Sequence, residues 1–145
     1  MHDVPRKLTA EELAELFEGR TRLVEQLAQL EDPLGSAREV IAQLSERDKL
    51  EALNAHPAVG AARLSPRSAA EQAGDSDPVI LTELAYLNQV YEEKFGFRFV
   101  VFVNRRSKAE ILEVLRERLE RTREEELDTA VEELVAIAED RWRQS

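Results

Sequence analysis

Apolar positions recur every three or four residues over most of the chain, which is the pattern of amphipathic helices. Several of these runs begin with Ser or Thr followed three residues later by Glu. In such a capping box, each side chain accepts a hydrogen bond from the other residue's backbone N–H. The boxes that precede longer apolar runs are Thr9–Glu12, Ser36–Glu39, Ser107–Glu110 and Thr122–Glu125. The sequence therefore predicts a helix starting at each of them.

Proline and glycine mark other helix boundaries. A leucine-rich stretch that starts at Leu23 is predicted to stop at Asp32-Pro33, because proline disfavours helix in the residue before it. Asp77-Pro78 is a favourable pair for the N-cap and first residue of a long helix, and that helix should end before Gly96.

Two stretches depart from the helical pattern. Residues 54–77 contain many alanines and little apolar bulk, which predicts a loop with one short helix around 66–73. Residues 97–103 are β-like, but no second strand is evident to pair with them, so we expect an extended buried segment between helices. The predicted fold is all-α: a single domain over residues 1–145, with about six or more helices and one extended segment at about 97–103.

Composition narrows the chemistry. The 145 residues contain no cysteine and two histidines, which excludes disulfides, thiolate nucleophiles and cysteine-ligated metals. Thirty acidic against twenty basic residues give a net charge of -10, which argues against nucleic acid and anionic membranes as partners. No apolar run is long enough for a membrane span or a signal peptide, so we expect a cytoplasmic protein. The acidic residues are dispersed beside Lys or Arg, and no metal site is predicted.

His56, which is followed by Pro57, is the first candidate catalytic residue. Imidazole is the side chain best suited to move a proton near neutral pH, and the other histidine, His2, lies near the chain terminus. The alternative is structural, because a histidine at a helix C-terminus interacts favourably with the helix dipole.

Ser68, Glu71 and Gln72 form a second candidate group. Their spacing of three and four residues would place a hydroxyl, a carboxylate and an amide on one face of a short helix. The same residues also form a capping box, which alone would be purely structural.

Arg141 and the extended segment supply candidate binding groups. An arginine that turns inward from the last helix can hold a carboxylate through two hydrogen bonds, although most arginines are solvated and paired with nearby acids. Residues 95–102 are expected to lie in the core, at least at alternate positions, and their backbone groups would need partners if buried. A flat heterocycle with urea-like edges could provide those partners.

Taken together, these motifs resemble the OHCU decarboxylases, over roughly two thirds of the chain. The matching phrases are His56-Pro57, Ser68 to Gly74, Leu87-Asn88, Tyr91, Lys94 to Val100, Arg106-Ser107-Lys108 and Ile137 to Arg141. The resemblance implies an all-helical enzyme without cofactors. It would decarboxylate 2-oxo-4-hydroxy-4-carboxy-5-ureidoimidazoline to (S)-allantoin and CO2 in urate catabolism.

The resemblance also implies site residues. His56 would match the catalytic proton donor, with Glu71 as a catalytic or orienting carboxylate and Pro57 shaping the pocket. The implied substrate-binding residues are Ser68, Gln72, Phe97, Phe99, Val100, Val101 and Arg141. By analogy with relatives, the protein would act on a small anionic substrate, form a homodimer, and be linked functionally to uricase and hydroxyisourate hydrolase.

Two other functions fit the same residues. The N-terminal third departs from the family pattern, and Ala58-Val59 replaces a common Asp-Leu, so a non-catalytic helical interaction module is one alternative. A hydrolase of a related ureide, in which His56 and Glu71 activate water, is the other.

Overall fold

The computed structural model describes residues 7–57 and 77–144, and within these ranges the chain forms seven helices and no strand. The helices are α1 (Ala10–Phe17), α2 (Arg22–Leu27), α3 (Pro33–Gln43), α4 (Glu46–Asn54), α6 (Pro78–Phe95), α7 (Lys108–Arg118) and α8 (Arg123–Gln144). The predicted all-α class is confirmed. No helix in these ranges is long and apolar enough to cross a membrane.

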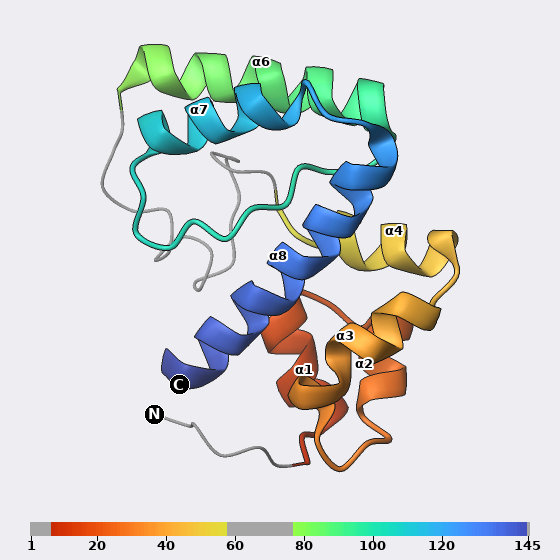
Figure 1. Ribbon diagram of the computed structural model, residues 1–145. Helices are drawn as coiled ribbons and strands as arrows, with labels where there is room; N and C mark the ends of the chain where they lie inside the picture. The colour runs from red at the N-terminus through yellow and green to blue at the C-terminus, as the bar shows by residue number, and fades with distance from the viewer. Residues whose placement is uncertain (1–6, 58–76, 145) are drawn as a thin grey trace.

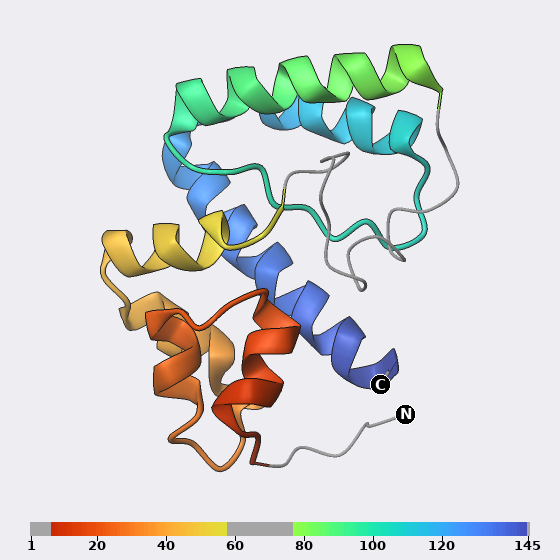
Figure 2. The ribbon, with the colours of Figure 1, turned by 180° about the vertical axis from the view of Figure 1, so that it is seen from behind.

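The helices form two groups that α8 connects. Helices α6 and α7 lie side by side at one end of the molecule, and α1, α2 and α3 gather at the other (Figures 1 and 2). Helix α8 starts beside the first group and crosses the molecule to pack on α1 and α3, and it also contacts α4 on the way. A residue near the end of α8 therefore meets residues from the beginning of the chain.

Most of the predicted helix boundaries are confirmed. Thr9 and Ser107 form complete capping boxes, and Thr122 and Glu125 exchange the same pair of hydrogen bonds. Asp77 is the N-cap of α6 and Gly96 its C-cap, as expected. The helix start predicted at Ser36–Glu39 is wrong, because α3 already begins at Pro33. Asp32 is its N-cap and accepts from the Gly35 N–H at 3.1 Å, so Asp32-Pro33 starts a helix there instead of only breaking one.

Residues 97–103 are extended without belonging to a sheet, as predicted. They carry the chain from the end of α6 back to the start of α7, so that these two neighbouring helices run in the same direction (Figure 1). Side chains replace a neighbouring strand. The Asn54 Oδ1 accepts from the Arg98 N–H at 2.9 Å, Glu133 accepts from the Phe102 N–H at 3.3 Å, and Arg118 donates to the Val100 carbonyl at 2.8 Å.

Aromatic rings fix this segment in the core. Tyr91 lies at the centre of a cluster, with ring centroids 4.6 Å from Phe95, 5.9 Å from Phe97 and 5.2 Å from Phe99. All four side chains are buried, and Val100 and Val101 are buried beside them. Tilted and edge-on aromatic pairs add to the free energy of burying such large rings. The extended segment is therefore held rigidly although it has no strand partner.

A buried ion pair ties α6, α7 and α8 together beneath this cluster. The Glu126 carboxylate is 0% exposed and accepts from Tyr91 Oη at 2.5 Å, Arg118 Nε at 2.7 Å and Arg121 Nη1 at 3.0 Å. A buried carboxylate is tolerated when its oxygens are paired and hydrogen-bonded, as they are here. Burial and the bond to Glu126 raise the pKa of Tyr91, so that its hydroxyl keeps its proton.

Candidate functional site

His56 lies two residues after the end of α4, and the last turn of this helix determines the position of its backbone. Ser45 caps the start of α4, the helix ends at Asn54, and the His56 N–H still donates to the Leu53 carbonyl at 3.2 Å. The side chain of His56 is buried, with 5% of the residue exposed. The imidazole is therefore directed into the protein by the last turn of the helix.

The imidazole of His56 is not fully satisfied inside the protein. Its Nε2 atom is buried and has no hydrogen-bond partner among the described residues. Buried polar atoms of native proteins nearly always have a partner, and the exceptions concentrate where a ligand or a reaction supplies one. This atom is the strongest single indication of a functional site in the described chain.

The environment of His56 favours its neutral form. Burial, together with the nearby positive charges of Arg141 and Arg98, lowers the pKa of His56 to about 4, and the Glu18 carboxylate opposes this shift. At neutral pH the free protein therefore carries an uncharged imidazole.

Arg98 fixes the backbone that carries His56. Its Nη1 donates to the carbonyls of His56 at 2.5 Å and of Asn54 at 3.3 Å, and its Nε lies 3.3 Å from a carboxylate oxygen of Glu92. The Arg98 N–H also binds the Asn54 side chain. These contacts bring the extended segment against the residues that end α4, and they give Arg98 a positioning role that the sequence analysis did not single out.

Arg141 turns inward from α8 and is 3% exposed, so the solvated alternative is wrong. Its Nη1 donates to the Leu16 carbonyl at 3.1 Å, and its Nη2 lies 3.1 Å from Glu18 Oε1. Both acceptors belong to the end of α1. The positive charge of Arg141 contributes to the low pKa of His56, which indicates that the two side chains lie near each other.

Glu18 is the second site residue that sequence reasoning missed. It is the C-cap of α1, in the left-handed region with φ 66° and ψ 24°, and its side chain is 12% exposed. Gly19 follows it, and a Cβ built on Gly19 would lie 3.6 Å from the Cβ of Ala55. The turn that carries Glu18 therefore packs against the residue that precedes His56.

The remaining predicted site residues divide into two groups. Pro57 is half-buried beside His56, and the side chains of Phe97, Phe99, Val100 and Val101 are in the core. None of the described residues bonds to the backbone of Phe99 or Val101, so a ligand could meet these two residues through their peptide groups. Ser68, Glu71, Gln72 and the short helix predicted at 66–73 lie outside the described residues.

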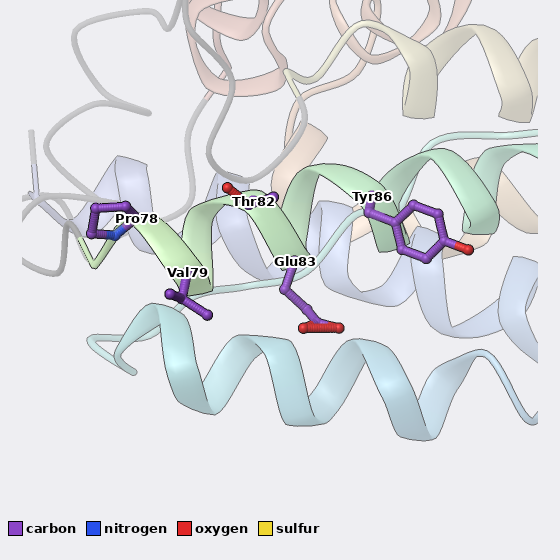
Figure 3. Close-up of a pocket in the computed structure, with 5 residues that line it drawn as sticks. All are labelled: Pro78, Val79, Thr82, Glu83 and Tyr86. Atoms are coloured by element: carbon purple, nitrogen blue, oxygen red, sulfur yellow. The ribbon is translucent and has the colours of Figure 1, made fainter.

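Two further features concern other kinds of site. Within residues 7–57 and 77–144, no three His, Asp or Glu side chains are arranged to hold a metal ion. A hollow of about 460 Å³ lies along α6, lined by Pro78, Val79, Thr82, Glu83 and Tyr86 (Figure 3). It contains neither imidazole nor buried cation, and its lining includes none of the predicted site residues.

The sequence is similar to that of known proteins. The sequence model of the OHCU decarboxylase family matches residues 2–143. The uric acid degradation bifunctional protein TTL of Arabidopsis thaliana is 36% identical over 107 residues, which are 67% of this chain and 33% of that protein. A 2-oxo-4-hydroxy-4-carboxy-5-ureidoimidazoline decarboxylase of Haloferax volcanii is 33% identical over 115 residues, 74% of this chain and 68% of that protein.

The fold is similar as well. A crystal structure of OHCU decarboxylase in the presence of (S)-allantoin superposes with a TM-score of 0.79 and 29% identity, covering 92% of this chain and 96% of that one. The match to the bifunctional Arabidopsis relative, by contrast, spans only a third of that protein's length.

Proposed function

This chain belongs to the OHCU decarboxylase family, and from that premise we propose that it converts 2-oxo-4-hydroxy-4-carboxy-5-ureidoimidazoline to (S)-allantoin and CO2. The observation that carries the proposal is the buried His56, whose Nε2 has no protein partner among the described residues, next to the buried cation Arg141. A proton donor and a positive charge in one protected site are what decarboxylation followed by protonation requires. The relatives named for urate degradation support the same pathway.

The reaction needs a proton at one carbon and on one face. The bond between the ring carbon and the carboxylate breaks, CO2 leaves, and the electron pair is delocalised into the adjacent ring before that carbon is protonated. His56 acts as the general acid that delivers this proton. A fixed donor determines the configuration of the product, and such proton transfer is typically worth about 10²- to 10⁴-fold in rate.

The low pKa of His56 in the free protein fits this role once the substrate's charge is considered. Burial favours neutral imidazole, but a carboxylate brought beside it favours the charged form and raises its pKa. The proton is then held only in the complex. Arg141 offsets the negative charge of the substrate, which would otherwise be repelled by a protein of net charge -10.

The other predicted residues complete the proposed site. Glu71 orients or tunes His56 or a substrate hydroxyl, Ser68 and Gln72 bind polar edges, and Pro57 shapes the wall. The peptide groups of the Phe97 to Val101 stretch read the flat ring and the ureido group. This last role is supported by the peptide groups of Phe99 and Val101, which make no hydrogen bond to any described residue.

We further propose that residues 1–145 act as one domain in the cytoplasm, with a small anionic substrate, as a homodimer, and in functional connection with uricase and hydroxyisourate hydrolase. No cofactor or metal is needed for the steps above.

The test is to follow the decay of freshly made substrate, prepared from urate with uricase and hydroxyisourate hydrolase, with and without this protein. Faster loss of substrate, with one CO2 released for each allantoin formed, supports the proposal. An unchanged decay would identify a non-catalytic module. Faster loss without CO2 would identify a ureide hydrolase.

A further inference from the structure

We propose that Glu18 is a positioning residue for the reaction: its carboxylate holds the Arg141 guanidinium in the orientation in which Arg141 meets the substrate anion beside His56. The inference rests on the proposed function and deepens it, because it names the group that prepares the site's cation. Glu18 lies in the N-terminal third, far in sequence from both other residues.

The contacts fix the guanidinium in two directions. Nη2 of Arg141 lies 3.1 Å from Glu18 Oε1, and Nη1 donates to the Leu16 carbonyl at 3.1 Å. A guanidinium is planar, so two acceptors on different nitrogens determine its plane. Loss of Glu18 removes one of these two acceptors and so weakens the constraint on that plane.

Burial makes the pair strong. Arg141 is 3% exposed and the Glu18 side chain 12%, so water screens their attraction much less than it screens a surface pair. Elsewhere in the same fold, the pair formed by Arg20 and Glu25 is about half exposed on both sides, and it provides a control of the same chemistry.

The backbone at Glu18 gives an independent reason to consider this residue functional. Its φ of 66° and ψ of 24° are a conformation that glycine adopts most easily and that is strained for a residue with a Cβ. Strain of this kind persists where the surroundings over-determine it, and it is common at functional sites. Glycine would suit the end of α1 better, but glycine has no carboxylate to offer Arg141.

Glu18 also belongs to the set of charges that faces His56 from the elements packed around it. Arg141 on α8 and Arg98 on the extended segment both disfavour the imidazolium, whereas Glu18 at the end of α1 favours it. Without Glu18, the two cations would face the imidazole without this balancing carboxylate. His56 should then hold a proton less readily, and activity should require a lower pH.

The experiment compares Glu18→Gln and Glu18→Gly with the matched surface variant Glu25→Gln. Both variants lose the buried pair, but glycine also relieves the left-handed backbone, so Glu18→Gly should be more stable than Glu18→Gln. We expect both Glu18 variants to raise KM about tenfold and to shift the pH profile of kcat/KM toward acid, while Glu25→Gln behaves as wild type. Because the chain has only two histidines, NMR can also follow the titration of His56 directly, and its midpoint should fall in both Glu18 variants.

The experiment distinguishes failure of the proposed function from failure of the role of Glu18. A wild-type protein that does not decarboxylate the substrate overturns the proposed function, and this inference with it. An active wild type whose folded Glu18 variants match Glu25→Gln in KM, pH profile and His56 titration overturns only the role of Glu18.

Discussion

The buried imidazole of His56 should make the stability of this protein depend on pH in a defined way. In the unfolded chain a histidine titrates near its ordinary pKa of 6.5, whereas in the folded protein the pKa of His56 is about 4. Between these values the unfolded state binds a proton that the folded state does not. The contribution of neutral His56 is therefore complete above pH 6.5 and is lost as the pH falls toward 4.

The size of the effect follows from the two pKa values. Linkage gives a loss of about 2 kcal/mol in the free energy of unfolding between pH 7 and pH 5, and about 3 kcal/mol by pH 4. His56→Asn removes the titrating group and leaves the carboxylates, so the difference between wild type and variant isolates this histidine. Urea denaturation at several pH values measures that difference.

A difference in the free energy of unfolding between wild type and His56→Asn that stays constant from pH 7 to pH 4 would contradict this expectation. Parallel curves would mean that His56 is solvated or already charged in the folded protein. Either finding would remove the basis for a protected imidazole in the site.

Three further variants test the surroundings of the site. Arg98→Lys keeps the charge but cannot bind Glu92 and two carbonyls at once. We expect kcat/KM, measured by substrate decay, to fall about tenfold while the circular dichroism spectrum stays unchanged. A variant with the full rate would contradict the positioning role. Glu126→Gln leaves Arg118 buried without its counter-ion and should cost about 3 kcal/mol in urea unfolding; a loss below 1 kcal/mol would contradict the buried-pair account. In Gly96→Ala the new Cβ meets no atom within 4 Å, but alanine must adopt a φ of 81°. The melting temperature should therefore drop by an amount equivalent to about 1 kcal/mol. An unchanged melting temperature would contradict the left-handed conformation at this residue.

Much of the fold could be predicted from local sequence because helix capping is a local interaction. Thr9, Ser107 and Asp77 start helices through contacts within three residues, and those contacts are legible in the sequence. The Ser36–Glu39 box failed for the same local reason, because Asp32-Pro33 offers an equally good start one turn earlier. The extended segment was predicted because a single β-like run has nothing to pair with.

The site could be predicted only in part. His56 was conspicuous because only two histidines occur, and Arg141 stood within a phrase of the family pattern. Glu18 gave no signal, and Arg98 lay within a family phrase without being singled out. Glu18 meets Arg141 only because α8 crosses the whole molecule, and Arg98 meets His56 only because the extended segment returns past α4. Contacts between residues so far apart in sequence depend on the packing of helices, which local patterns do not specify.

The most direct test of the central claim is the circular dichroism of allantoin formed from fresh substrate by wild type and by His56→Ala. If His56 delivers the proton, wild type gives the signal of (S)-allantoin, and the folded variant gives racemic product at the uncatalysed rate. Racemic allantoin from wild type, or an unchanged excess of the S form from His56→Ala, would contradict it.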